Sequence, residues 1–153
     1  MRTILAGLSF VLGGCVAGSG APPPLPPLAE DRAQPVLALF EHVLTGYFAR
    51  VGATGPTTCA QLTPGPLTAE QERELIARFV RLAPAARCLA AAGGPIDAIT
   101  REPAALVQVY DVRQADTATT AWAAVPGAPA IRYTMRFDNG AWRFDSDPRL
   151  IAE

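Results

Sequence analysis

The stretch IRYTMRFDNGAWRF, residues 131–144, decides the fold because it predicts a complete β-hairpin. Apolar side chains alternate with polar ones before the turn, which is the period of a half-buried strand. Asn139-Gly140 favours a type I′ turn, since both central residues of that turn need positive φ. A two-residue turn sets Phe137 opposite Trp142. The hairpin should then present one aromatic-rich face, made by Ile131, Tyr133, Met135, Phe137, Trp142 and Phe144.

Two runs upstream of the hairpin predict further strands. ALVQVYDVR, at about residues 104–112, is apolar and β-branched, and TATTAWAAV, which follows it, is weaker but rich in threonine. Such residues suit a pleated, half-buried surface. Together with the hairpin they predict an antiparallel meander with one apolar face.

Helical periodicity precedes these strands. In the first helix, at about residues 35–50, apolar residues recur three and four positions apart, Pro35 suits the first turn and Gly52 suits the stop. Thr68 and Gln71 form a capping-box pattern for a second helix. Residues 55–66 should form a loop, and a shorter helical piece is expected at 84–92. The apolar face of the second helix is predicted to be Leu75, Ile76, Phe79, Val80 and Leu82.

Helices followed by an antiparallel meander predict an α+β fold, with the N-terminal helices packed on a curved antiparallel sheet that ends in the Asn-Gly hairpin. Over residues 34–147 this order, with its YTMRFDNGAWRF ending, resembles NTF2-like and cystatin-like cone-fold domains. The resemblance implies a pocket between sheet and helices, where Asp, His or Tyr groups do acid–base work. That family often has a further strand between its second and third helices, for which the sequence offers no candidate.

The N-terminus predicts export. Residues 1–14, MRTILAGLSFVLGG, combine Arg2, a short apolar run and small residues, as in a signal peptide. Leu12-Gly13-Gly14-Cys15 resembles the bacterial lipobox, which implies that Cys15 becomes a lipidated N-terminus held in a membrane by its acyl chains. By the same resemblance, Val16 favours the outer membrane. The alternative is an ordinary cleaved signal with an incidental cysteine.

Residues 15–33 are expected to be the lipidated cysteine and a tether, and residues 34–153 a single domain. The tether contains AGSGAPPPLPPLA, in which Gly and Ser are flexible and the prolines favour an extended spacer. A PxxP peptide ligand is the alternative use of the same prolines.

Composition excludes several functions. The chain has 153 residues and a net charge of -1, so bulk attraction to nucleic acid is not expected. All 13 basic residues are arginine, and without lysine there is no Schiff-base or P-loop chemistry.

Cys59 and Cys88 are predicted to form a disulfide, because an exported protein meets an oxidising compartment. A metal or redox site is the alternative, but the chain has no CxxC motif and one histidine, His42. We expect neither a metal nor a cofactor.

Asp111 is the first candidate for chemistry. If it entered an apolar pocket, desolvation would raise its pKa and make it a general base, with His42 and Tyr133 as weak candidates beside it. Tyr47 and Tyr110 complete the possible partners. Alternatively, Asp111 marks the exit of the strand to solvent or pairs with an arginine, and His42 is an ordinary boundary residue.

Three arginines alternate on the polar face of the last hairpin, with Arg136 expected opposite Arg143. An anion or lipid-headgroup patch is one interpretation. A solvated face balanced by nearby aspartates is the other. The three are Arg132, Arg136 and Arg143.

The functional hypothesis is a lipoprotein of the bacterial envelope that faces the periplasm and acts as a non-catalytic binding or accessory module. Its partners would be the bilayer, through acylated Cys15, and an envelope protein or small apolar ligand, but no nucleic acid. One alternative is an NTF2-like pocket enzyme or small-ligand binder using Asp111. Another is a structural part of a larger envelope complex.

Overall fold

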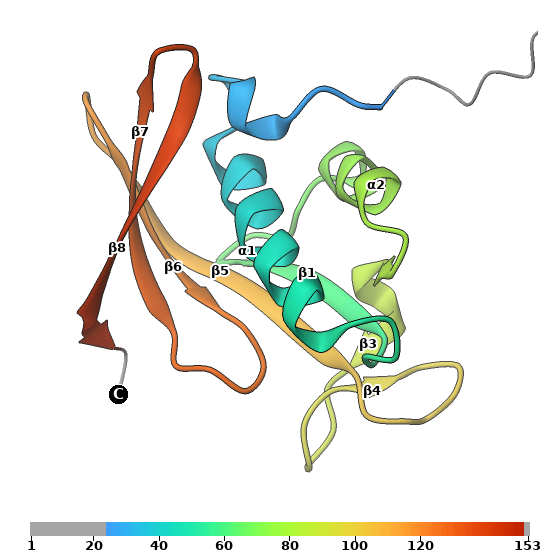
Figure 1. Ribbon diagram of the computed structural model, residues 1–153. Coiled ribbons are helices and arrows are strands. Elements are labelled where there is room, and N and C mark those ends of the chain that lie inside the picture. The colour runs from blue at the N-terminus through green and yellow to red at the C-terminus, as the bar shows by residue number, and fades with distance from the viewer. Residues whose placement is uncertain (1–23, 152–153) are drawn as a thin grey trace, which may run out of the picture.

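The computed structural model describes residues 24–151, which form two α-helices and a six-stranded, mostly antiparallel sheet (Figure 1). The expected combination of helices and antiparallel strands is confirmed. The signal segment and Cys15 lie outside the described residues. The elements are η1 (Leu28–Glu30), α1 (Pro35–Val51), β1 (Thr58–Thr63), α2 (Ala69–Arg78), β2 (Leu82–Ala83), η2 (Ala85–Arg87), β3 (Cys88–Leu89), β4 (Ile96–Asp97), β5 (Ala105–Gln114), β6 (Thr119–Ala124), β7 (Ile131–Asp138) and β8 (Ala141–Ile151).

The strand order of the sheet is β2-β1-β5-β6-β7-β8. From β5 to β8 neighbouring strands are antiparallel, but β1 runs parallel to both β2 and β5. The predicted antiparallel meander is therefore confirmed for β5 to β8, but the sheet as a whole also has two parallel pairs, and the expected loop at 55–66 contains β1. Parallel neighbours require a crossover, which α2 supplies between β1 and β2.

Both helices begin as predicted. Pro35 occupies the first turn of α1, and Gly52, with φ of 63°, follows its last residue. In α2 the Thr68 hydroxyl accepts from the Gln71 N–H at 3.2 Å, and the Gln71 side chain accepts from the Thr68 N–H at 3.0 Å. This reciprocal pair is a capping box. The buried residues of α1 are Leu37, Ala38, Leu39, Phe40, Val43, Leu44 and Tyr47.

The second helix is shorter than its apolar pattern predicted. It ends at Arg78, where Phe79 turns into extended backbone, and Val80 is 97% exposed instead of facing the core. The helical piece expected at 84–92 is one 3-10 turn followed by β3. Cys88 pairs with Asp97 of β4, and this pairing keeps the segment extended.

In the last hairpin, β7 and β8 pair with Phe137 opposite Trp142. The turn residues Asn139 and Gly140 have φ of 51° and 80°. Met135 is fully buried and Trp142 is 9% exposed, within the cluster that α1 fills. Both helices lie on this side of the sheet (Figure 1).

The folded domain begins earlier than residue 34. Leu28, in the predicted tether, is 2% exposed and joins the core cluster. The Glu41 carboxylate accepts from the backbone N–H groups of Leu28 and Ala29 at 2.8 and 3.3 Å. The indole N–H of Trp142 donates to the Asp31 carbonyl at 2.8 Å. The end of the tether is therefore fixed to the domain, because Leu28 fills an apolar site and its backbone is hydrogen-bonded.

Candidate functional site

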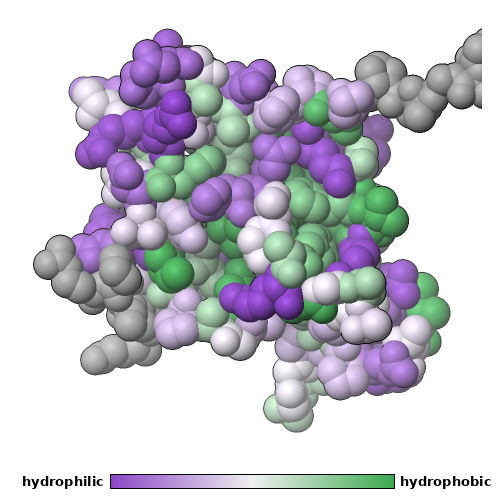
Figure 2. Space-filling model, in the orientation of Figure 1, coloured by the Kyte–Doolittle hydropathy of each residue, from purple (hydrophilic) through white to green (hydrophobic). Residues whose placement is uncertain are grey.

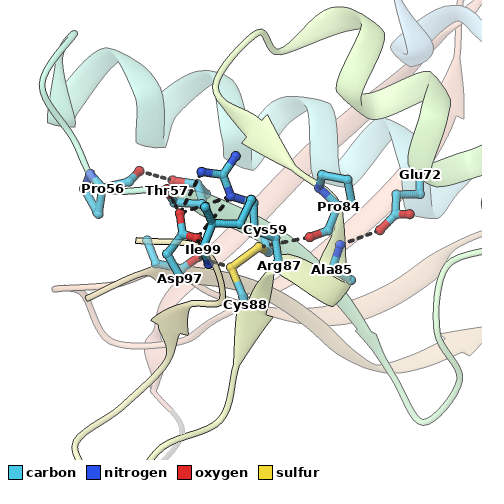
Figure 3. The surroundings of a disulfide bond; sticks show 12 residues. Pro56, Thr57, Cys59, Glu72, Pro84, Ala85, Arg87, Cys88, Asp97 and Ile99 are labelled. Atoms are coloured by element: carbon cyan, nitrogen blue, oxygen red, sulfur yellow. Dashed lines mark hydrogen bonds and ion pairs between the residues drawn. A yellow bond between two sulfur atoms is a disulfide. The ribbon is translucent and has the colours of Figure 1, made fainter. Parts of the chain in front are cut away.

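Cys59 of β1 and Cys88 of β3 are joined by a disulfide, as predicted (Figure 3). Their Cα atoms are 6.2 Å apart and the bond spans 29 positions of sequence. Cys59 is fully buried. The bond fixes the segment after α2 against one end of the sheet.

A buried carboxylate that sequence analysis missed lies beside the disulfide (Figure 3). Asp97 is fully buried, the Arg87 guanidinium lies 2.9 Å from it, and the Thr57 hydroxyl donates to it at 2.6 Å. The Ile99 N–H also donates, at 2.8 Å. Arg87, and then Thr57, hold the pKa of Asp97 well below its usual range. Asp97 is thus an anion that ties β4 to η2 and to Thr57, the residue before β1. In the sequence, the only sign of this site is an aspartate at the start of a short turn.

Asp111 does not occupy an apolar pocket, which argues against this weak candidate for a buried general base. It lies at a β-bulge between Tyr110 and Arg113, and its φ is 51°. Its side chain is 42% exposed, and the Arg113 guanidinium donates to it at 2.9 Å. A bulge interrupts the alternation of faces, and the pairing with arginine is the alternative that the geometry supports.

The two weaker candidates, His42 and Tyr133, do come together. The His42 ring stacks on Phe144 with centroids 4.5 Å apart, and the Tyr133 ring meets it edge-on at 5.7 Å. Burial lowers the pKa of His42 and raises that of Tyr133, so both favour their neutral forms. His42 lines a groove of about 570 Å³ together with Glu41 and Arg78, which we call the His42 groove. Asp111 is not among its lining residues.

The other two candidate tyrosines, Tyr47 and Tyr110, lie apart from His42 and from each other. Tyr47 is 2% exposed in the core, where its ring packs edge-on against Phe48 at 5.5 Å. Tyr110 lies on the opposite face of the sheet and stacks on Trp122. Within residues 24–151, no group of three or more His, Cys, Asp or Glu side chains is placed to hold a metal ion.

The sheet face that points away from the helices carries aromatic, amide, hydroxyl and arginine side chains. Residues of β1 and β5 to β7 that face away from α1 line up across the strands, so that Tyr110 pairs with Trp122 and Trp122 with Arg132. The Tyr110 and Trp122 rings are nearly parallel, with centroids 6.4 Å apart and planes 9° apart. We call this surface the open face; it comprises Gln61, Thr63, Gln108, Tyr110, Thr120, Trp122, Arg132 and Thr134.

A cavity adjoins the open face at the disulfide end. Gln108 donates from its amide to the Gln61 side-chain carbonyl at 2.8 Å, and Gln61 also lines a cavity of about 300 Å³. Leu106 and Cys88 line it too, so the disulfide fixes one of its walls. Its remaining lining residues are small: Ala85, Ala90, Ala91, Gly94 and Pro95.

Two of the three arginines of the last hairpin, Arg132 and Arg136, lie beside acidic residues. Arg136 lies opposite Arg143, as the hairpin register predicted, and forms an ion pair of 3.3 Å with Asp145. Arg132 lies opposite Asp147. This arrangement agrees with a solvated, charge-balanced face more than with an anion patch.

No protein-family model, curated protein or solved structure matches the chain. Among the helices of residues 24–151, none has both the length and the apolar character needed to cross a membrane.

Proposed function

We propose that this protein is a non-catalytic binding module of the bacterial envelope, anchored by lipid on Cys15, that uses the open face of its sheet. The observation that carries the proposal is the uncovered Tyr110–Trp122 pair, in register with Arg132. Both helices cover the other side of the sheet (Figure 1). Aromatic rings on a surface offer a large, rigid contact area at little conformational cost.

The anchor remains a proposal that rests on the LGGC segment and on the disulfide, a bond typical of exported proteins. Within the described residues, the first hydrogen bond to the domain is made by the Pro26 carbonyl, which accepts from Arg78. The ten residues between Cys15 and Pro26 can reach roughly 30 Å when extended. A domain on this tether would work close to a membrane surface, which we take to be the outer membrane facing the periplasm.

A second candidate is small-ligand binding in the His42 groove. The stacked His42 and Phe144 rings and a volume of about 570 Å³ favour it. This groove, between α1 and β8, is also where the cone-fold resemblance would have its pocket. Since Asp111 is exposed and paired with Arg113, the groove is the better place for any pocket function.

Site-specific photo-crosslinking in living cells tests the choice between the two surfaces. A photoreactive residue replaces Thr120 or Thr134 on the open face, Thr45 in the His42 groove, or exposed Glu70 at the start of α2 as a control. We expect covalent adducts, detected by mass, from Thr120 and Thr134 but not from Glu70. Adducts from Thr45 alone would overturn the open face in favour of the groove. Equal adducts from all four positions, or none, would contradict a specific binding surface.

A further inference from the structure

We infer, building on the proposed binding function, that the open face binds a glycan strand carrying N-acetylated sugars. Three features of this surface support that chemistry: a stacked aromatic pair, an amide pair with unused hydrogen-bonding groups, and a small cavity next to them. The near-neutral charge of the face supports it as well.

The aromatic pair supplies a stacking platform. The Tyr110 and Trp122 rings are stacked, with their planes 9° apart and their centroids 6.4 Å apart, and we call this pair the ledge. The face of an aromatic ring carries partial negative charge. The axial C–H groups of a pyranose carry partial positive charge, so a sugar ring can lie flat on this ledge.

The amide pair supplies polar groups suited to hydroxyls and amides. The Gln61 carbonyl accepts from Gln108 at 2.8 Å, which leaves both N–H donors of Gln61 and the carbonyl of Gln108 for a ligand. Thr63 and Thr120 add hydroxyl groups on the same face. A group that both donates and accepts, as a sugar hydroxyl does, matches this mixed set.

The cavity suits an acetamido group. Its lining combines the Gln61 amide with Leu106, Pro95 and several alanines, and its volume is about 300 Å³. The methyl of an N-acetyl group would contact the apolar lining while its amide pairs with Gln61. From Tyr110 to Leu106 is four residues along β5, roughly 13 Å at the rise of a strand. Occupying both the ledge and the cavity therefore takes a chain of sugars, and a single sugar is too short.

Charge and surface composition argue against other macromolecules. The arginines at the edges of the face are paired, Arg136 with Asp145 and Arg113 with Asp111, so the face lacks the excess positive charge that nucleic acid needs. Figure 2 shows the helix side of the molecule, where hydrophobic residues gather over the helices. Among the described residues the large exposed apolar side chains lie off the open face: Leu25, Val80, Leu89 and Ile99. The core of a protein–protein interface is enriched in apolar area, and these four side chains add none to the open face.

Titration calorimetry of the full-length protein in mild detergent tests the inference. The probes are chitotetraose, cellotetraose as a matched chain without acetamido groups, and free N-acetylglucosamine. We expect chitotetraose to bind at least tenfold more tightly than either of the others. Trp122→Ala should weaken chitotetraose binding at least tenfold, while Trp122→Tyr, which keeps a ring on the ledge, and His42→Ala should stay within threefold of the native protein. Equal binding of the two tetrasaccharides, no chitotetraose binding, or an unaffected Trp122→Ala variant would overturn the inference.

A pelleting assay separates the possible sources of such a glycan. Retention on insoluble cell-wall sacculi would identify the wall strand as ligand, and retention on chitin beads alone would identify a free chitin-type chain. Retention on neither overturns the inference. If adducts from Thr120 and Thr134 persist while no glycan binds, the ligand class is wrong and the binding surface stands. If both fail, the proposed function fails with it.

Discussion

Replacing both Cys59 and Cys88 by alanine should destabilise the domain by about 3.6 kcal/mol at 25 °C, from the loop-closure entropy of a bond that spans 29 positions. The loss arises mainly in the unfolded chain, which the bond constrains. Small domains have a total stability of about 5–15 kcal/mol, so this bond is a large share of it. For the length described here, we expect the Tm to fall by roughly 13 °C.

Urea unfolding followed by tryptophan fluorescence measures this change. The native protein unfolded in reductant is the internal control, because it should show the same loss as the double alanine variant. Each variant is also tested for its m-value, since a change there would report a different unfolded state. A loss below about 1 kcal/mol in both samples would refute the entropic account of this bond.

Three further perturbations test the packing. Leu28→Ala should lower the free energy of unfolding by about 3 kcal/mol in urea, because it leaves a cavity in the core. Leu25→Ala, at a residue 51% exposed, is the control and should cost under about 0.5 kcal/mol. Equal effects would contradict the burial of Leu28 in the domain. Trp142→Ala should lower the free energy of unfolding by about 3–5 kcal/mol, because it removes a buried ring. Trp142→Phe loses mainly the indole hydrogen bond and should lower it by about 1 kcal/mol. A smaller loss of stability for alanine than for phenylalanine would contradict the burial of this ring. Arg87 lowers the pKa of Asp97, so the ionised Asp97 side chain adds stability above about pH 4, and that stability is lost as the pH falls further. Melting temperatures measured over a pH series should show this decrease at acid pH. Asp97→Asn should make the decrease smaller.

Local sequence patterns predicted the elements whose signals lie within a few residues. The Asn139-Gly140 turn, the Thr68 capping box and Pro35 at the start of α1 all act through neighbouring backbone, and the structure has all three. The pairing of Cys59 with Cys88 was predictable for another reason. In the described part of the chain they are the two available cysteines.

Elements that depend on distant contacts were missed. β1 is short, lies between prolines, and becomes a strand by pairing in parallel with β2 and β5, both of which are separated from it in sequence by α2. Val80 continues the apolar spacing of α2, yet the helix ends before it, because Phe79 turns into extended backbone. Asp97 gains its importance from Arg87 and Thr57, which reach it through the fold.

The candidate site was predicted only in part. His42 and Tyr133 were named, but their stacking with Phe144 needed the relative position of α1 and the hairpin. The bulge after Tyr110 moved Asp111 to solvent and could not be read from alternation. The open face depends on register across four strands, which no local pattern specifies.

The two tryptophans permit the most direct test of the central claim, that the open face binds a glycan strand. Trp122 lies on the open face and Trp142 is buried on the helix side, where it bonds to Asp31, so the indole N–H signals in a ¹⁵N NMR spectrum report the two faces separately. The full-length protein in detergent micelles is titrated with cell-wall glycan fragments. We predict that the Trp122 signal shifts in a saturable way while the Trp142 signal stays in place. A shift of Trp142 alone, or of neither signal, would contradict the account.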